Sequence, residues 1–406
     1  MVRVFMLLCM ISLSGCSVVN TLRMKSANDD IVPLWAKAQS IQHFDATYIG
    51  HKPYITVNAN GQDLLFLIDT GASFSILFDT EKGRNVSSTK GYELSVGGWG
   101  EGASTPAYQT VINTLMLGNI TFSDVKVAYI PLSESHYYHT PQEARFDGVL
   151  GHDILRHFAW RFDKQSGVIS ASREPLLPIA NHVAIPFTTF WGKLSIPASV
   201  HFDSEHQYER EVVIDTGSRH YFKLNTAFIK NNDITLPQTI SAADFGMNGK
   251  AMHHRFTLDK LVIGELTFNN VKSNVIKSDD EDDWWIIGSA LINQYVSIID
   301  YHTSQFALTP YENSVFRSQY NLSGLEIRKL IDGNFVVRHV ADGFAAKDEN
   351  IEVGDVITRI NQMPAQSLSE EEWLSIANVD IPLSLCIESK RCVTLPMNHI
   401  DGYSNL

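Results

Sequence analysis

The stretch Leu65-Phe66-Leu67-Ile68-Asp69-Thr70-Gly71-Ala72 decides the fold, because the chain contains this pattern twice. The second copy is Glu211-Val212-Val213-Ile214-Asp215-Thr216-Gly217-Ser218. Each copy is an apolar strand that ends in Asp-Thr-Gly and a small residue. A lone Asp-Thr-Gly is weak evidence, since average residue usage places one in about one of every ten chains of this length. Two copies, each preceded by an apolar strand, are much rarer and indicate a repeated structural unit.

The similarity between the two halves continues beyond these motifs. At the same offset of 146 positions (215 − 69), residues 117–126 align with residues 263–272. Further on, Val149-Leu150-Gly151 aligns with Ile286-Ile287-Gly288 at an offset of 137 positions (286 − 149), because the first copy has a longer loop. Self-similarity at a fixed spacing is typical of a duplicated unit. Two copies predict a pair of lobes around a pseudo-twofold axis rather than a solenoid.

Length, composition and charge narrow the class of protein. A chain of 406 residues is long enough for two or three domains with hydrophobic cores. Its 44% apolar and 19% charged residues are typical of a globular protein. The net charge of −13 comes with no basic stripe that could bind phosphates, so no nucleic-acid partner is expected.

The N-terminus has the pattern of a targeting segment. Arg3 precedes the apolar run 4–11, which is shorter than the roughly 20 residues that span a bilayer. We therefore expect a secretory signal over residues 1–15. Leu13-Ser14-Gly15-Cys16 resembles the bacterial lipobox, and this resemblance implies that Cys16 is lipidated. An ordinary signal peptide with an incidental cysteine is the alternative. By the same resemblance, Ser17 favours an outer-membrane lipoprotein that faces the periplasm over retention in the inner membrane.

Two cysteines remain after the signal and the lipidation site are set aside. Cys386 and Cys392 are an even pair in an oxidising compartment, and the residues between them could form a hairpin tip. A disulfide is therefore the hypothesis, and two free thiols are the alternative. Residues 16–44 are expected to form the lipidated cysteine and a tether, with one short helix near residues 34–41.

The remaining chain divides into two lobes and a third domain. We expect the first lobe over residues 45–185 and the second over residues 186–312. The glycine-rich stretch 95–102 predicts a mobile hairpin in the first lobe, since glycines permit unusual backbone angles and weaken local order. Residues 245–249 occupy the corresponding place in the second lobe.

Residues 313–406 differ in character from both lobes. Their motifs resemble a PDZ domain of the bacterial type. The resemblance implies that Gly324, Leu325, Glu326 and Ile327 form the loop whose backbone N–H groups hold the terminal carboxylate of a peptide. A packing module that binds no free peptide is the alternative, because the helix that would wall the groove is short.

The duplicated motifs resemble the pepsin and retropepsin aspartic proteases over residues 45–312. The resemblance implies an all-β fold of two pseudo-symmetric β-barrel lobes, followed by a small α+β PDZ domain. It also implies that Asp69 and Asp215 are the catalytic pair. Two carboxylates about 3 Å apart cannot both ionise cheaply, so they share one proton. One then takes a proton from the attacking water, while the other protonates the developing oxyanion and the leaving amine.

The same resemblance implies roles for the neighbours of the pair. Gly71 and Gly217 permit tight loops that bring the carboxylates to the axis. Thr70 and Thr216 match the threonines whose hydroxyls reach across to the partner loop. The mechanism requires no metal or other cofactor, and none is expected.

The flap that covers the substrate in this family corresponds to the hairpin with Gly97, Gly98 and Trp99. Core packing is the alternative role for Trp99. Arg219 and His220 follow the second motif, where pepsins carry small or apolar residues. A guanidinium near the pair would lower its apparent pKa, and the alternative is that Arg219 points outward and pairs with acids.

The sequence therefore predicts an aspartic endopeptidase, anchored through its lipid to a bacterial membrane. We expect a monomer that acts on peptide or protein substrates and whose PDZ groove accepts a C-terminal peptide. The rival is a catalytically silent lipoprotein that binds peptides on a protease scaffold, although both aspartates and both threonines are present. Metalloprotease and serine-hydrolase chemistry are disfavoured, because His-Glu-x-x-His and Gly-x-Ser-x-Gly motifs are absent from the sequence.

Overall fold

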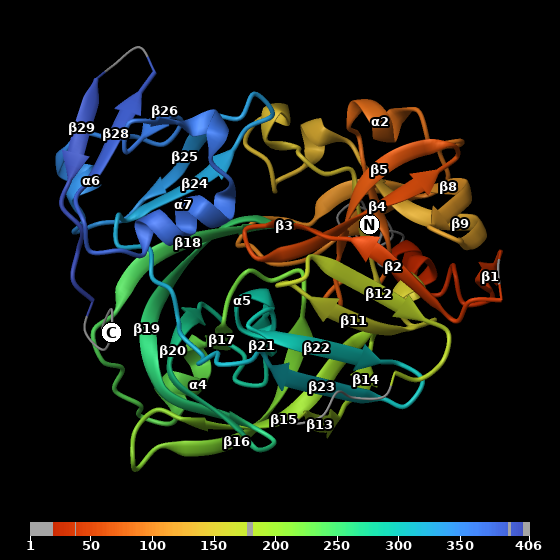
Figure 1. The fold of residues 1–406 in the computed structure, drawn as a ribbon, viewed down its shortest axis with the longest axis horizontal. Coiled ribbons are helices and arrows are strands. Elements are labelled where there is room, and N and C mark those ends of the chain that lie inside the picture. Colours follow the sequence, from red (N-terminus) through yellow and green to blue (C-terminus); the bar gives the residue numbers. More distant parts are fainter. Residues whose placement is uncertain (1–18, 37, 177–181, 389–390, 401–406) are drawn as a thin grey trace, which may run out of the picture.

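We describe the computed structural model of the chain for residues 19–36, 38–176, 182–388 and 391–400. The expected signal segment and Cys16 lie outside these residues. The chain is mostly β, as predicted (Figure 1). Within the described ranges, no helix has the length and apolar character needed to cross a bilayer.

The first Asp-Thr-Gly motif follows a central strand of a nine-stranded sheet. Its order is β1-β9-β6-β10-β5-β4-β8-β7, with β3 paired to β4. The strand β5 leads directly to Asp69. The elements are β1 (Leu34–Trp35), β3 (Thr47–Ile49), β4 (Lys52–Ala59), β5 (Gln62–Ile68), β6 (Ile76–Phe78), α2 (Glu81–Arg84), β7 (Glu93–Val96), β8 (Thr105–Leu117), β9 (Ile120–Ile130), η1 (Leu132–Glu134), η2 (Pro141–Glu143), β10 (Gly148–Leu150) and α3 (His152–Leu155).

The second motif ends a strand in an eight-stranded sheet of the same plan. Its order is β14-β15-β16-β21-β17-β20-β19-β18. In both lobes the later apolar segment pairs in parallel with the strand that leads to the aspartate, Leu150 opposite Ile68 and Ile287 opposite Ile214. The elements are β14 (Thr188–Phe190), β15 (Lys193–His201), β16 (Gln207–Asp215), β17 (Phe222–Asn225), α4 (Thr226–Asn231), β18 (Ile240–Gly246), β19 (Gly249–Ile263), β20 (Leu266–Ile276), β21 (Trp285–Gly288) and α5 (Ser289–Ile292).

A third sheet of six strands joins the lobes, because both contribute to it. Its order is β13-β23-β22-β11-β12-β2, and the lobes meet where β11 pairs with β22. Its strands are β2 (Ile41–Asp45), β11 (Ala159–Asp163), β12 (Val168–Ser172), β13 (Val183–Pro186), β22 (Tyr295–Asp300) and β23 (Gln305–Pro310). One buried hydrophobic cluster runs through both lobes, so the two lobes share one core.

The segment expected to be a tether packs against the body instead. The expected helix near residues 34–41 is wrong, because β1 and β2 lie there as strands. The edge of the six-stranded sheet offers β2 a continuous partner in β12, and Phe44 stacks on Trp160 in the core. Further upstream, Met24 is fully buried and Asn28 donates a 2.7 Å hydrogen bond to the buried Asp153. Long-range pairing therefore overrides the weak local helix signal.

The C-terminal domain has its own sheet and its own core. The sheet order is β24-β25-β26-β28-β29, with β27 paired to β26. Cys386 and Cys392 lie directly opposite each other on β28 and β29 and are joined by a disulfide. The elements are β24 (Leu325–Lys329), β25 (Phe335–Val340), α6 (Ala345–Asp348), β26 (Val356–Ile360), β27 (Met363–Pro364), η3 (Ala365–Ser367), α7 (Glu370–Ala377), β28 (Leu383–Ile387) and β29 (Cys392–Leu395). Figure 1 shows this domain, in blue, beside β18 of the second lobe and β3 of the first.

Candidate active site

The two Asp-Thr-Gly loops meet between the lobes and hold each other by reciprocal hydrogen bonds. Thr70 Oγ1 donates to the carbonyl of Ile214 at 2.7 Å, and Thr216 Oγ1 donates to the carbonyl of Ile68 at 2.8 Å. In return, each hydroxyl accepts the backbone N–H of the other threonine, at 3.1 and 3.0 Å. Both threonines are buried. Each hydroxyl therefore both donates and accepts a hydrogen bond across the two loops, and these contacts fix the position of one loop relative to the other.

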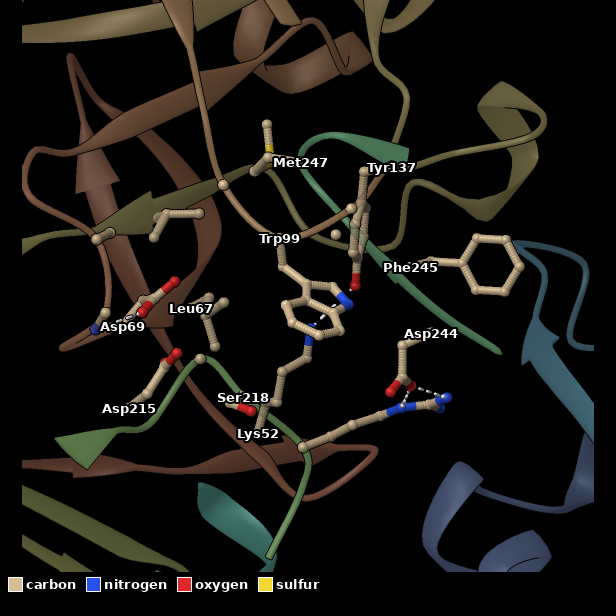
Figure 2. Close-up of a pocket in the computed structure, with 18 of the residues that line it drawn as sticks. Lys52, Leu67, Asp69, Trp99, Tyr137, Asp215, Ser218, Asp244, Phe245 and Met247 are labelled. Atoms are coloured by element: carbon tan, nitrogen blue, oxygen red, sulfur yellow. Dashed lines mark hydrogen bonds and ion pairs between the residues drawn. The ribbon is translucent and has the colours of Figure 1, made fainter. Parts of the chain in front are cut away.

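The carboxylates of Asp69 and Asp215 lie next to each other in the cleft (Figure 2). Each packs against the glycine of the opposite loop. A Cβ atom added at Gly71 would lie 2.6 Å from the carboxyl of Asp215, and one added at Gly217 would lie 2.2 Å from that of Asp69. Any side chain at either glycine would push a carboxylate away. These positions therefore require glycine because of close approach, as the tight-loop prediction implied.

Asp69 has an environment that favours its protonated form. Burial and the Asp215 carboxylate raise the pKa of Asp69 to about 7, against the opposing effects of Lys193, the Gly71 N–H and Lys52. Asp215 Oδ1 is buried and has no hydrogen-bond partner among the described residues. Two adjacent carboxylates of this kind titrate as a unit and keep one shared proton up to near-neutral pH.

Two lysines flank the pair, and sequence reasoning did not find them. Lys52 begins β4 and Lys193 begins β15, and the two occupy equivalent places in the duplicated hairpins. Lys193 Nζ donates to the carbonyl of Gly71, and Lys52 Nζ donates to the hydroxyl of Tyr137 at 2.9 Å. The equivalence is hidden in the sequence because the hairpin tips differ in length. An alignment anchored on the strand pairs, with Tyr54 opposite Leu67 and Ser195 opposite Val213, reveals it.

Both lobes contribute a flap to the roof of the cleft. The first flap is the turn between β7 and β8, and the second is the turn between β18 and β19. The tips are joined, since Asn248 N–H donates to Trp99 O at 2.8 Å and Gly102 N–H donates to Asn248 O at 2.8 Å. Gly98 N–H also donates to Asn248 Oδ1 at 3.1 Å. The structure is therefore a closed form in which the two flaps hold each other.

Trp99 faces the cleft beneath this roof. Its indole ring is half-buried and lines a cavity of about 700 Å³ that also contains Asp69 and Asp215. The ammonium group of Lys223 lies 4.0 Å from the centre of the ring. Gly97 and Gly98 line the same cavity. The structure thus places all three flap residues at the cleft.

Arg219 points away from the pair and forms ion pairs with acids. Its guanidinium lies 3.1 Å from Asp244 and 2.8 Å from Glu326 of the PDZ domain. Arg255 reaches the other oxygen of Glu326 at 2.8 Å. His220 is buried with Nε2 2.6 Å from Asp244, and burial keeps the pKa of its imidazole well below the usual value. Arg219 therefore connects the second Asp-Thr-Gly loop to the PDZ domain.

One backbone N–H of the predicted carboxylate-binding loop already donates to a neighbouring side chain. Leu325 N–H donates to Ser323 Oγ at 3.2 Å, and Ser323 N–H donates to Asn321 Oδ1 at 3.1 Å. The Phe344 ring covers Gly324, where an added Cβ would lie 2.3 Å from it. This geometry favours a packing module over a site for a free C-terminus.

Of the predicted peptide-binding residues, Ile327 lines the protease cleft, together with two further residues of the PDZ domain. Ile327 and Arg328 of β24 and Glu370 of α7 line the same cavity as the two aspartates. Arg338 forms a 3.2 Å ion pair with the buried Glu143 of the first lobe. The PDZ domain therefore contacts both lobes and forms one end of the cleft.

Comparisons with known proteins agree with this geometry. Residues 55–154 match the family model described as aspartyl protease, and residues 314–378 match the model of the PDZ domain. Among curated proteins, no match was found. The first matched segment includes the Asp69 loop and extends through most of α3. The chain therefore contains an aspartyl protease domain of the retropepsin-like type and a PDZ domain.

Proposed function

We propose that this protein is an aspartic endopeptidase that hydrolyses peptide bonds with a water molecule activated by Asp69 and Asp215. The observation that carries the proposal is the reciprocal contact of the two catalytic loops. Each threonine is fixed by the partner loop, and each carboxylate packs on the partner glycine. Such a symmetric arrangement places two carboxylates where they share one proton.

The shared proton gives the pair both roles that peptide hydrolysis needs. The ionised carboxylate takes a proton from water, and the water oxygen attacks the carbonyl carbon of the substrate. The protonated carboxyl donates its proton to the carbonyl oxygen as that oxygen gains negative charge. As the C–N bond breaks, the proton taken from water passes to the leaving amine, and a hydroxyl of the tetrahedral diol returns its proton to the other carboxylate as the new carboxyl group forms. The pair is then mono-protonated again. Because the pKa of Asp69 is raised to about 7, this mono-protonated form persists over a wide acidic to neutral range.

The cleft is lined by residues from the N-terminal region, both lobes and the PDZ domain, which suits an enzyme that binds an extended peptide. Its lining runs from Thr21 and Lys25 near the N-terminus, past the pair, to Ile327 and Glu370 of the PDZ domain. A substrate held along this line would have its scissile bond away from both of its ends. Closed flaps above the pair would exclude bulk water from the reaction.

The test is a peptide library incubated with the full-length protein in detergent, from acidic to neutral pH. Mass spectrometry would identify cuts made by the wild type and compare them with Asp69→Asn and Asp215→Asn, which preserve side-chain volume. Cuts that vanish in both variants support the proposal. A wild type that binds peptides but cuts none supports the silent binding protein, and cuts that persist in the variants exclude the pair as the catalyst.

We also propose that Cys16 carries a lipid and that the protein resides at the outer membrane on the periplasmic side. The lipobox-like motif supports lipidation, and the disulfide of the PDZ domain suits an oxidising compartment. Asn20 already donates a 2.8 Å hydrogen bond to the first lobe, so an anchor at Cys16 would hold the body close to the bilayer. Metabolic labelling with palmitate and membrane fractionation test this, with Cys16→Ala as the variant that should lose both label and membrane association.

A further inference from the structure

Lys223 is a buried cation whose ammonium makes no ion-pair contact with the described residues, although Asp244 and Asp215 attract it from a greater distance. It lies on β17 immediately after the second catalytic loop and is only 4% exposed. Its ammonium lies over the Trp99 ring at 4.0 Å. Within the described part of the chain, the ammonium group of Lys223 forms no hydrogen bond or ion pair. Buried lysines are rare unless they are paired, because removing the charge from water is costly. An unpaired ammonium in the wall of a cleft indicates that a bound ligand supplies the negative group that pairs with it.

The pseudo-symmetry identifies what stands at this position in the other lobe. Ile76 of β6 pairs with Val149 of β10, and Lys223 of β17 pairs with Ile286 of β21. Val149 and Ile286 are equivalent in the duplicated sequence. The parallel pairings of β6 with β9 and of β17 with β20 also make Lys223 equivalent to Ile76. Lys223 therefore replaces an isoleucine in an otherwise equivalent subsite.

The subsite of the first lobe is apolar and aromatic. Ile76 and Val149 line it and are 5% and 4% exposed. Tyr54 and Phe146 complete its wall, with ring centres 5.2 Å apart. The Lys52 ammonium lies 5.8 Å from the centre of the Phe146 ring. The place equivalent to Lys223 is nevertheless taken by the apolar Ile76. The surface suits a large apolar or aromatic side chain of a substrate.

The subsite of the second lobe combines apolar walls with the ammonium of Lys223. Burial lowers the pKa of that lysine, and Arg219 and Lys52 lie near enough to lower it further. Val213 and Ile286 line it beside Lys223. The nearby Asp244 does not neutralise Lys223, because its carboxylate is already engaged by Arg219 at 3.1 Å and by His220 at 2.6 Å. The charge of Lys223 is thus available to a ligand, and the catalytic Asp215 lies at the edge of the same subsite.

We propose that the second-lobe subsite selects an aspartate or glutamate side chain of the substrate through Lys223, while the first-lobe subsite takes a large apolar residue. The preferred scissile bond then joins an acidic residue to a large apolar one. This inference rests on the proposed function, since it names the substrate class of that same cleft.

The electrostatics of the cleft make this choice physically reasonable. The mono-protonated pair carries one negative charge, which would repel a nearby substrate carboxylate. A cation in the subsite offsets that repulsion, and a charge-assisted contact in a water-poor site discriminates strongly against a neutral analogue. Loss of one such contact typically costs about 10- to 100-fold in kcat/KM.

The experiment compares two fluorogenic peptides that differ only in Glu or Gln at one position beside the cleaved bond. The full-length protein in detergent should hydrolyse the Glu peptide about 10- to 100-fold faster in kcat/KM. Lys223→Ile, which installs the residue of the first lobe, should bring this ratio to one or below and should favour a Leu peptide. Lys230→Met removes an exposed lysine of the same lobe, on α4 and outside the cleft lining, and should keep the wild-type ratio. Each variant is tested with both peptides. A general loss of catalytic activity therefore lowers both kcat/KM values equally and leaves the Glu-to-Gln ratio unchanged.

A second measurement separates this inference from the proposed function. Binding of uncleavable reduced-amide versions of the Glu and Gln peptides is followed by fluorescence polarisation, and it requires no turnover. A Glu preference that Lys223→Ile abolishes supports the subsite even if no peptide is cut, in which case only the proposed function fails. A wild type without a Glu preference in either assay overturns the inference, as does a folded Lys223→Ile that retains the preference. If Lys223→Ile does not fold, Lys223→Met takes its place with the same expected ratio.

Discussion

Glu326 of the PDZ domain lies 2.8 Å from Arg219, the residue that directly follows the second Asp-Thr-Gly-Ser motif. Arg255 of the second lobe contacts the same carboxylate at 2.8 Å. The PDZ domain is thus joined to a catalytic loop through an ion pair that is largely shielded from water. Its expected contribution is to hold that loop rather than to capture a free peptide.

Replacing Glu326 with Gln should destabilise the whole protein. The change leaves two guanidinium groups without their shared anion, and breaking a buried pair from one side typically costs about 3 kcal/mol in the free energy of unfolding. Urea unfolding would measure this difference. Asp380→Asn is the matched control, because Asp380 is an exposed acid of the same domain. Equal stability of the two variants would contradict a structural role for the Glu326 contacts.

Acidification should weaken the same interface. Burial raises the pKa of Glu326, but Arg255 and Arg219 outweigh this effect and hold the pKa below its usual value. The stabilisation is therefore present above the unfolded-state pKa and is lost as the pH falls through the folded-state value. The free energy of unfolding should be smaller at pH 3 than at pH 6, and Glu326→Gln should reduce this dependence. An unchanged dependence in the variant would assign the acid sensitivity to other groups.

Lys193 should set the upper pH limit of activity. Activity should fall as the pH rises through about 7, where the pair loses its shared proton, because the pKa of Asp69 is raised to about 7. The positive charge of Lys193 lowers that pKa, so Lys193→Met should raise it and move the alkaline limb of kcat/KM to higher pH. Lys230→Met is the control. If the alkaline limb of Lys193→Met moved to lower pH, Lys193 would not lower the pKa of Asp69 as this account requires.

Thr216→Val should disturb the pair although it touches no substrate. The variant loses the hydroxyl that donates to Ile68 O at 2.8 Å and accepts Thr70 N–H at 3.1 Å. Leaving these buried groups unpaired should cost about 1–3 kcal/mol of stability and lower kcat more than it raises KM. Thr216→Ser keeps the hydroxyl and should restore most of both. A folded Thr216→Val with the stability and kcat of the wild type would contradict a role for these hydrogen bonds.

The sequence was sufficient to predict that the two Asp-Thr-Gly loops meet, because the motifs can be recognised locally. Asp69 and Asp215 each stand in a short motif after an apolar strand, and the duplication links the two motifs. The reciprocal contacts of Thr70 and Thr216 follow once the loops are placed face to face. The mostly β fold was implied by the resemblance of these duplicated motifs to the aspartic proteases, and the structure confirms it.

Other features depend on contacts between distant segments and could not be read locally. The pairing of β2 with β12 gives the tether region a strand in place of the expected helix. Lys52 and Lys193 correspond only when the strand register is known, because the hairpins differ in length. The contact of Glu326 with Arg219 joins residues 107 positions apart, and no sequence motif indicates it.

The central claim is that Asp69 and Asp215 act as one catalytic unit. The most direct measurement is the rate of hydrolysis of a single identified peptide by the wild type, Asp69→Asn and Asp215→Asn at pH 6, with thermal unfolding as the check on folding. Each variant should remain folded and lose at least about 1,000-fold in kcat, because neither carboxylate can supply both proton transfers alone. A folded variant that retains wild-type turnover would contradict the shared pair.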